Sequence, residues 1–559
     1  MSTQSHEFDY IVVGGGTAGV VIASRLSQYL PASSIALLEA GPNAIDHPNV
    51  TNPTQLFDLL PQGLLIDYST VPQPNCNGRQ IPNLAGRMLS GSSGGNVGTW
   101  MRASATDYAL IAEKAGHERF GFKNMVRYFR RVETWWDEEG DKEFHGFGGP
   151  VHTVGGRKYP LRPVIKEAAE KLGYAYTLDA EKGDPTGFSD MVQCFRATGE
   201  SSSERQHSAK VYDLGKVNVR CDASVAKILL DGDKRATGVE LLSGERLYAK
   251  KEVIVSCGAQ KTPQLLMLSG IGPKDELAKH GVDMRVESPL VGQNLFDHSS
   301  LTQYFKLKDP SKGFALPFIG TMRPEYGQGF PWEFNIFSNI PPSTLAPVLT
   351  SDNIATGDRD LLHPHLREKR CHYMNIPFYL PVLAALGKYN PSIVPDDGAH
   401  IAVTSLNLLP VSRGTVTLRS PDPADPPLID PKYLSTQVDR FIMRTAVRTT
   451  LNLVSTPPFA DVLDGETPPA DEGFPALTSG SGDEEIDQRI RGFVETIAHP
   501  MGTCALGGVL DSEFRVRGVS GGSLRVCDAS VFPEPLGAMP SCTIYALAEL
   551  CADVVAGKA

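Results

Sequence analysis

The chain has 559 residues, of which 41% are hydrophobic and 21% charged, and this apolar content excludes disorder over its whole length because it can bury a large core. Nine cysteines at irregular spacing, with no CxxC pair, indicate neither a disulfide-rich scaffold nor a structural zinc site, so we expect no metal. The net charge of −11, without a basic stripe, argues against nucleic acid as a partner.

Targeting signals are absent from the sequence. The N-terminal residues contain no basic segment followed by an apolar one, so we expect no secretory signal. No apolar run approaches the ~18 residues that a membrane-spanning helix needs. These patterns predict a soluble cytoplasmic protein with reduced thiols and no membrane partner, and no motif indicates an oligomeric state.

The first predicted elements are a strand over residues 8–13 and a helix over residues 20–29, joined by a glycine-rich turn. A G-x-G-x-x-G motif between a strand and a helix predicts dinucleotide binding. Its three glycines permit, in order, the tight turn, the approach of backbone to a pyrophosphate, and close packing of helix on strand. The helix N-terminus offers unpaired N–H groups to the phosphates. The binding residues predicted here are Gly14, Gly16, Thr17, Ala18 and Gly19.

A second predicted strand, over residues 34–38, ends at Glu39. An acid at this point, about 20 residues after the last motif glycine, is placed to accept hydrogen bonds from a ribose diol. The position of the motif near the start of the chain favours FAD over NAD.

Further along the chain, short β-branched runs predict strands that return to the nucleotide domain. They lie at residues 217–220, 225–230, 238–242 and 252–256. Aromatic residues gather between residues 301 and 400, which fits either an aromatic-lined substrate domain or an ordinary core. Alternation predicts a strand over residues 411–418, and apolar spacing predicts an amphipathic helix over residues 439–454.

Four further segments carry a family resemblance. They are Gly86-Arg-Met-Leu-Ser-Gly-Ser-Ser-Gly-Gly-Asn96 continued to Trp100, residues 258–272, Val291-Gly-Gln-Asn-Leu-Phe-Asp-His298, and a tail from His499-Pro-Met-Gly-Thr503 through Asp528-Ala-Ser-Val-Phe-Pro533. The set resembles the glucose–methanol–choline (GMC) family of FAD-dependent oxidoreductases, in the family's order along the chain.

This resemblance implies an α/β fold, in which a Rossmann-like FAD-binding domain is interleaved with an α+β substrate-binding domain. The FAD-binding domain would comprise residues 1–155, 205–300 and 490–559, and the substrate-binding domain residues 156–204 and 301–489. The further residues that it implies at the cofactor are Ser92, Asn96, Val97, Gly98 and Thr99 along the flavin, Val225 at the adenine, and Asp528 and Ala529 at the pyrophosphate and ring. It implies a structural role for the turn that carries His298.

The resemblance also implies a reaction, oxidation of an alcohol on a small-molecule substrate by hydride transfer to flavin N5. A neutral imidazole suits the accompanying proton transfer, and His499 matches the family's general base. FAD is expected to be noncovalent, because Gly95 stands where some members carry the histidine that attaches the flavin. Ser90 stands where the family generally has glycine.

One departure leaves the reaction open. The family's second polar residue, a His or Asn, falls on Met539, whose thioether is a weak acceptor and cannot donate. Met539 is therefore a candidate substrate-pocket residue. The alternative is non-oxidative chemistry on the same fold, such as cyclisation, dehydration or photodecarboxylation. A fold retained only for binding is disfavoured, because His499, Glu39 and both glycine loops are kept.

Overall fold

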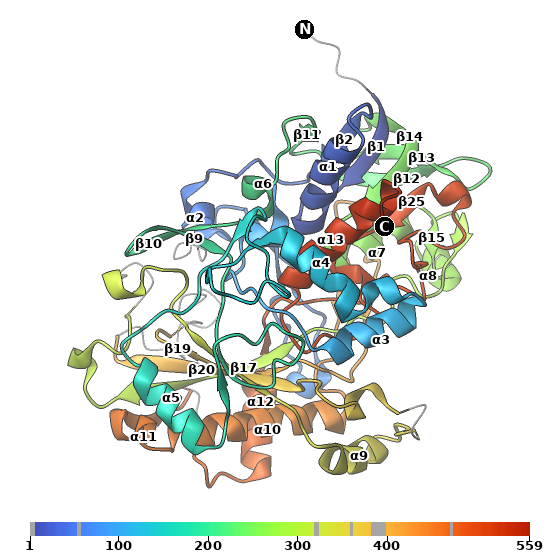
Figure 1. The fold of residues 1–559 in the computed structure, drawn as a ribbon. Helices are drawn as coiled ribbons and strands as arrows, with labels where there is room; N and C mark the ends of the chain where they lie inside the picture. Colours follow the sequence, from blue (N-terminus) through green and yellow to red (C-terminus); the bar gives the residue numbers. More distant parts are fainter. Residues whose placement is uncertain (1–5, 53–57, 318–322, 358–361, 382–397, 470–472) are drawn as a thin grey trace.

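The computed structural model describes residues 6–52, 58–317, 323–357, 362–381, 398–469 and 473–559. The described chain builds two large sheets, one in the upper and one in the lower part of the molecule (Figure 1). Each sheet takes strands from separated segments of the sequence, so the two halves are interleaved. This confirms the predicted α/β fold class.

The first sheet has the order β11-β2-β1-β14-β13-β12, and β25 also pairs with β14. Strands β11, β2, β1, β14 and β25 are parallel, and β12, β13 and β14 form an antiparallel meander. The strands are β1 (Glu7–Val13), β2 (Ile35–Leu38), β11 (Asn218–Arg220), β12 (Val225–Leu230), β13 (Ala236–Leu241), β14 (Arg246–Val255) and β25 (Leu524–Val526).

Helix α1 (Thr17–Tyr29) follows β1 and packs against β1 and β2 of the first sheet. Val20, Val21 and Ile22 are fully buried. The C-terminal helix α13 (Ser541–Val555) packs against α1 and against α4 (Phe122–Val132), so the end of the chain covers its beginning (Figure 1).

The second sheet has the order β23-β17-β20-β19-β18-β8-β7, and β24 also pairs with β17. It is antiparallel apart from the β7–β8 pair. Its strands are β7 (Tyr176–Thr177), β8 (Gly187–Asp190), β17 (Ser299–Leu307), β18 (Phe334–Ser338), β19 (Tyr373–Phe378), β20 (His400–Asn407), β23 (Leu463–Thr467) and β24 (Glu495–Thr496).

Helix α10 (Gln437–Val454) covers this second sheet (Figure 1). Three further helices pack against α10: α9 (Pro342–Ser351), α12 (Asp483–Phe493) and α5 (Arg162–Lys171). The remaining helices are α2 (Pro48–Thr51), α3 (Ala105–Ala115), α6 (Ser208–Val211), α7 (Gly258–Leu268), α8 (Lys274–Lys279) and α11 (Phe459–Val462). Small two-stranded sheets are formed by β3 (Leu65–Asp67) with β4 (Leu84–Gly86), β5 (Glu133–Thr134) with β6 (Val151–His152), β9 (Phe195–Gly199) with β10 (Ser202–Arg205), β15 (Ile271–Gly272) with β16 (Val286–Glu287), and β21 (Thr415–Thr417) with β22 (Leu428–Asp430).

One predicted strand is mostly wrong. Of residues 411–418, only β21 is a strand. The N–H groups of Val411 and Ser412 donate instead to the buried carboxylate of Asp439 in α10, at 2.6 and 3.0 Å. The predicted domain boundaries stay a prediction, although β24 lies in the second sheet while the sequence assigns residues from 490 onward to the FAD-binding domain.

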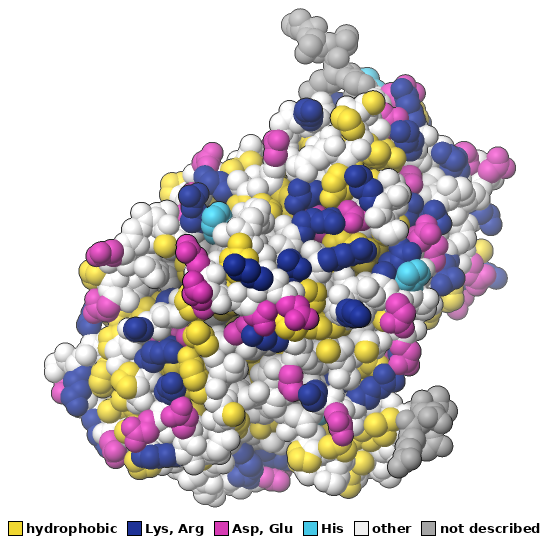
Figure 2. Space-filling view, in the orientation of Figure 1, with side chains coloured by type: hydrophobic (Ala, Val, Ile, Leu, Met, Phe, Trp, Pro, Cys, Tyr) yellow, Lys and Arg dark blue, Asp and Glu magenta, His cyan; other side chains and the backbone are white. Residues whose placement is uncertain are grey.

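Charged groups are mixed on the surface. On the face drawn in Figure 2, Lys and Arg side chains are interspersed with Asp and Glu side chains. All nine cysteines are free. Within the described ranges, no cluster of three or more His, Cys, Asp or Glu side chains is arranged to hold a metal ion, and no helix has both the length and the apolar content to cross a membrane.

Candidate functional site

The first glycine loop lies at the carboxyl end of β1. Gly14 has a φ of +99°, and a Cβ on Gly19 would lie 1.9 Å from the Gly14 carbonyl oxygen, so only glycine lets α1 approach this turn. Gly16 precedes α1 without a side-chain capping bond, and the first turn, which contains Thr17 and Ala18, has no acidic residue. The free N–H groups and dipole of this helix end suit a phosphate.

Glu39 lies beside this loop, directly after β2. Its carboxylate accepts hydrogen bonds from the N–H groups of Gly15 and Gly41, each at 2.8 Å. Burial raises the pKa of Glu39 to about 7, against the opposite effect of these two bonds. The acid is thus held at the motif glycines, where the ribose contact is predicted.

The second glycine loop touches the first. Gly91 has a φ of +52°, and a Cβ on it would lie 2.8 Å from the Cα of Gly16. Ser92 Oγ accepts from the Gly86 N–H at 3.0 Å, which fixes the turn of this loop. Two segments far apart in the sequence therefore meet backbone to backbone, with no side chain between them.

The loop continues through residues 96–99. Asn96 Oδ1 accepts from the Gly98 N–H at 2.9 Å and from the Arg205 guanidinium at 3.1 Å. Val97 is half-buried. The hydroxyl of Thr99 is buried and has no hydrogen-bond partner among the described residues. An orphaned buried hydroxyl, an uncapped helix start and two touching glycine loops together fit a bound dinucleotide.

Ser90 adopts a φ of +99°, a conformation that glycine would take without strain. Its Oγ accepts from the Ala209 N–H at 3.0 Å and pairs with His207 Nδ1 at 2.7 Å. These bonds offset the backbone strain and anchor the glycine loop to α6. This explains how serine is accommodated at a position where the family resemblance leads us to expect glycine.

The roles of the Ser90 hydroxyl and backbone can be separated by two substitutions. Ser90→Ala should lower the free energy of unfolding by about 1–3 kcal/mol, because it leaves the Ala209 N–H unsatisfied and keeps the strain. Ser90→Gly should lower it less, since glycine removes a strain of about 1 kcal/mol. Urea unfolding measures both, and a larger loss for Ser90→Gly would contradict this account.

The residues predicted at the two ends of the cofactor lie on or directly after strands of the first sheet. Val225 begins β12. The Asp528 carboxylate accepts from the Gly258 N–H at 2.9 Å and from the Thr262 hydroxyl at 2.6 Å, both in α7, so this side chain caps the start of that helix. The Ala529 carbonyl accepts from the Gly502 N–H at 3.2 Å and joins the tail to the His499 segment.

His499 pairs with a second histidine, His298. The two Nδ1 atoms are 3.1 Å apart, and the rings are inclined by 81°. Burial, and to a smaller extent the nearby His298 ring, hold the pKa of His499 well below its usual range. His499 is therefore a neutral imidazole at neutral pH.

The sequence interpretation of His298 as part of a purely structural turn missed this contact. His298 and His499 meet because residues 296–300 run antiparallel to residues 495–501, through the Ser299–Thr496 pair and the Phe296–Met501 bridge. Two histidines in short polar motifs are the available sequence signal, but only the strand pairing shows that they touch.

The backbone before His499 is strained. Ala498 has a φ of +57°, which is unfavourable for a residue with a Cβ. The Thr496 hydroxyl accepts from the Ala498 N–H at 2.8 Å and holds this turn. Backbone strain of this kind is often retained at functional sites.

Met539 lies in the hydrophobic core at 6% exposure, two residues before α13. Among the described residues, no hydrogen bond or ring contact joins it to His499, so its role in a substrate pocket stays a prediction.

The aromatic residues of the middle region mostly form core. Trp332 and Phe378 pack edge to face with ring centres 4.3 Å apart, and Phe330 joins them at 5.5 Å from Trp332. All three are buried. The core interpretation therefore holds for this group.

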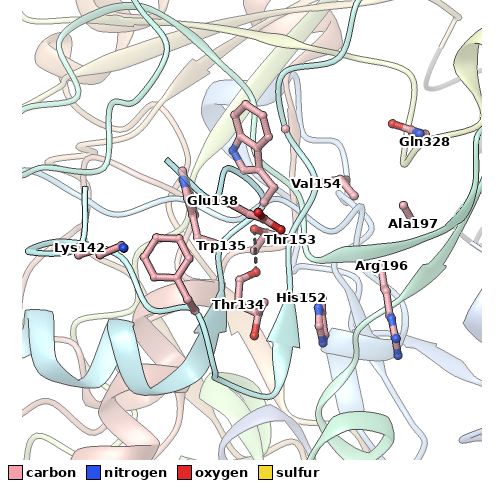
Figure 3. Close-up of a pocket in the computed structure, with 13 residues that line it drawn as sticks. Thr134, Trp135, Glu138, Lys142, His152, Thr153, Val154, Arg196, Ala197 and Gln328 are labelled. Carbon is pink, nitrogen blue, oxygen red and sulfur yellow. Dashed lines mark hydrogen bonds between the residues drawn. The ribbon is translucent and has the colours of Figure 1, made fainter. Parts of the chain in front are cut away.

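An open groove of about 930 Å³ lies elsewhere, beside β5, β6 and β9 (Figure 3). Lys142 and Arg196 lie at opposite ends of it, with Trp135 and Thr134 between them. None of the residues predicted to bind cofactor or substrate lines this groove. Val154, which lines the groove, forms an antiparallel backbone bridge with Gln193, and Gln193 forms another with Thr99 of the second glycine loop.

Comparison with known proteins identifies similar chains over the whole length. The family model described as GMC oxidoreductase matches residues 8–300 and 410–548. The GMC-type oxidoreductase acuG of Aspergillus aculeatus is 37% identical over 99% of both chains. Choline oxidase of Arthrobacter globiformis is 32% identical over 98% of this chain and 94% of its own.

A solved structure has the same fold. A variant of Aspergillus oryzae RIB40 formate oxidase, studied for FAD modification, superposes with a TM-score of 0.86 at 26% identity and covers 100% of this chain and 99% of its own. The family and this neighbour support FAD as the cofactor that the two glycine loops fit.

Proposed function

Because the chain belongs to the GMC oxidoreductase family, and is thus an oxidoreductase, we propose that it oxidises the CH–OH group of a small-molecule alcohol with His499 as general base. The observation that carries this proposal is the His499 ring, whose low pKa keeps it neutral and able to accept a proton. The identity of its relatives as oxidases and oxidoreductases supports the oxidative direction.

The chain's own residues would hold the cofactor noncovalently. Gly16 and the first turn of α1 would receive the pyrophosphate, Glu39 the ribose, and the loop from Ser92 to Thr99 the flavin. Gly95 has no side chain that could attach the flavin, and a Cβ there would lie 2.7 Å from Leu65 Cδ2, so a larger residue would require the Leu65 side chain to move. When bound, FAD supplies the acceptor for a hydride.

The protein's contribution to the reaction is the proton transfer. Oxidation of an alcohol to a carbonyl removes a hydride from carbon and a proton from oxygen. The proton would go to the free ring nitrogen of His499, while the fold orients the C–H bond and excludes water.

The test is anaerobic mixing of the FAD-loaded enzyme with choline, benzyl alcohol and formate in separate experiments. Bleaching of the visible band of oxidised flavin by an alcohol, with one aldehyde formed per flavin reduced, is the expected result. Bleaching by formate alone would shift the proposal to a carboxylate substrate. If no alcohol in an extended panel bleaches the band, alcohol oxidation is refuted.

The non-oxidative alternative rests on Met539 alone, and the relatives do not favour it. Such a reaction would turn over substrate without a two-electron product. The same anaerobic experiment separates the two, because a stoichiometric aldehyde contradicts the non-oxidative reaction.

A further inference from the structure

One carboxylate closes the turn that carries His499. Asp297 Oδ1 accepts from the backbone N–H of His499 at 2.9 Å, and Oδ2 accepts from the Thr496 hydroxyl at 2.6 Å. The Thr496 oxygen accepts in turn from the N–H of Ala498, the residue whose φ is +57°. Both ends of residues 496–499 are therefore held by a single side chain, with the strained position between them.

The carboxylate of Asp297 is itself fixed by elements outside this turn. Asn83, just before β4, donates from Nδ2 to Oδ2 at 3.0 Å, and the hydroxyl of Tyr433, shortly before α10, donates to the same oxygen. Gln260 of α7 donates to the Asn83 side chain at 2.9 Å. Because Asp528 caps the start of α7, this network ties the His499 turn to the part of the fold that we expect to bind FAD.

The direction of these hydrogen bonds follows from the atoms that make them. Backbone and amide N–H groups only donate, and an ionised carboxylate only accepts. Asp297 is 3% exposed, and burial raises its pKa to about 6 against the effect of the hydrogen bonds, so the group is ionised at a pH of about 8. Among the described residues its partners are four neutral donors and no cation. A buried charge of this kind is costly to leave unpaired, which keeps each donor in place.

The ring of His499 is held much less firmly than its backbone. In the described part of the chain, this ring hydrogen-bonds to the His298 ring, at 3.1 Å, and to no other group. The position of the imidazole therefore depends on where the turn places the backbone of His499. A residue with a Cβ disfavours the φ of Ala498, so a turn without its hydrogen bonds would relax and carry the ring with it.

We propose that Asp297 is a positioning residue for the base: its carboxylate holds residues 496–499 in their strained form and thereby fixes where the His499 imidazole lies. The consequence for catalysis rests on the proposed function, whereas the hold on the turn does not. In this role Asp297 exchanges no proton with the substrate, and its effect on the rate passes through His499.

Two substitutions separate the acceptor from the packing. Asn and Leu have nearly the same shape, but Asp297→Asn keeps an oxygen that can accept from the His499 N–H, and Asp297→Leu removes both acceptors. Thr496→Val is the third variant, because it keeps the carboxylate and the shape of threonine but removes the hydroxyl that joins the turn to Asp297. All are studied as FAD-loaded full-length protein at a pH of about 8, where Asp297 is ionised.

The matched control is Asp439→Leu, which makes the same change at another buried carboxylate. Asp439 is 1% exposed and accepts from the backbone N–H groups of Val411 and Ser412. It makes no hydrogen bond to residues 496–499 among the described contacts. The control therefore lowers stability in the same way without releasing the His499 turn.

The first readout is hydrogen exchange of the His499 backbone amide, measured by NMR of protein that carries isotope-labelled histidine, without substrate. The His499 signal is assigned by its absence from the His499→Ala spectrum. We expect exchange at least about 10-fold faster in Asp297→Leu than in Asp439→Leu, and an intermediate rate in Asp297→Asn, because the N–H loses its acceptor only in the first variant. Equal exchange in Asp297→Leu and Asp439→Leu would overturn the inference.

The second readout is the rate constant of flavin reduction under anaerobic conditions, with choline or benzyl alcohol, whichever reduces the wild type faster. Asp297→Leu should slow reduction at saturating substrate by about 10- to 100-fold, because a misplacement of about 1 Å can cost about 100-fold, while KM changes little. Asp297→Asn should lose less, and Asp439→Leu should stay near the wild type. A loss in Asp439→Leu as large as in Asp297→Leu would show that the rate follows stability and not position.

A double variant shows whether the effect passes through the base. Once His499→Ala has removed the imidazole, the further change Asp297→Leu should slow reduction by no more than a few-fold, because the two residues act as one unit. If the double variant shows the full loss of Asp297→Leu on top of that of His499→Ala, Asp297 acts by another route and the positioning role is refuted.

Failure of the proposed function gives a different pattern. In that case His499→Ala reduces as fast as the wild type, or neither alcohol reduces the flavin, while amide exchange still decides whether Asp297 holds the turn. If Asp297→Leu does not fold, Thr496→Val takes its place in every comparison. Slow reduction in His499→Ala, with a wild-type rate in a folded variant that has lost the turn contact, would refute the positioning role alone.

Discussion

Replacement of His499 by alanine should slow flavin reduction by an alcohol by about 10²–10⁴-fold, the usual contribution of a positioned general base. FAD should stay bound, because the residues proposed to hold it are the two glycine loops and Glu39, and His499 is not among them. Stopped-flow reduction under anaerobic conditions measures the rate constant, and the flavin-to-protein absorbance ratio measures cofactor content.

The matched control is His372→Ala. His372, immediately before β19, is also a buried histidine whose pKa burial lowers to about 4. Its ring accepts a hydrogen bond from the Ile340 N–H at 3.0 Å, and it has no place in the proposed reaction. It should reduce at the wild-type rate. A wild-type rate in His499→Ala would remove His499 from its role.

The pH dependence of the same rate constant follows from the environment of His499. The base works only when neutral, and burial lowers its pKa well below the ordinary histidine value of about 6.5. The rate constant should therefore stay level as pH falls through that value and decline only at more acid pH. An inflection at or above pH of about 6.5 would contradict this environment.

Replacement of Gly19 by alanine should produce a protein that does not retain FAD and unfolds at a lower temperature. The new Cβ would lie 1.9 Å from the Gly14 carbonyl oxygen, and a backbone atom cannot yield as a flexible side chain can. Helix α1 must then move away from the turn that we expect to receive the phosphates. Overpacking of this kind costs typically about 1–3 kcal/mol.

Gly232→Ala is the control, because it makes the same glycine-to-alanine replacement at a position where a side chain has room. Gly232 lies between β12 and β13, and a Cβ there would have nothing within 4 Å. This variant should keep both its FAD and its melting temperature. Flavin absorbance after gel filtration and thermal unfolding are the measurements, and full FAD retention by Gly19→Ala would show that the contact can relax.

The sequence predicts the nucleotide-binding part of the fold well because the signals there are local. A turn that needs a positive φ and a close approach of backbone allows almost only glycine, so Gly14 and Gly19 are recognisable without any tertiary contact. The strands at residues 225–230 and the helix at residues 439–454 lie within or very near the observed elements β12 and α10.

Predictions were less complete where the local structure depends on hydrogen bonds from distant parts of the chain. The alternation over residues 411–418 predicts a longer strand than exists, because Asp439 takes the backbone N–H groups of Val411 and Ser412. The Asp528 side chain is used to cap α7, which its position in the tail motif could not indicate. In both cases the deciding hydrogen bond comes from a distant element.

The sequence by itself determined the cofactor class, the family and His499 as the candidate base. Each of these can be recognised from a short motif of adjacent residues that contains glycine or histidine. Only the tertiary structure decided what surrounds that base. His298 lies 201 residues before His499, and their rings meet because β24 pairs with β17. A contact of that kind depends on strand register between separated segments, which no local pattern specifies.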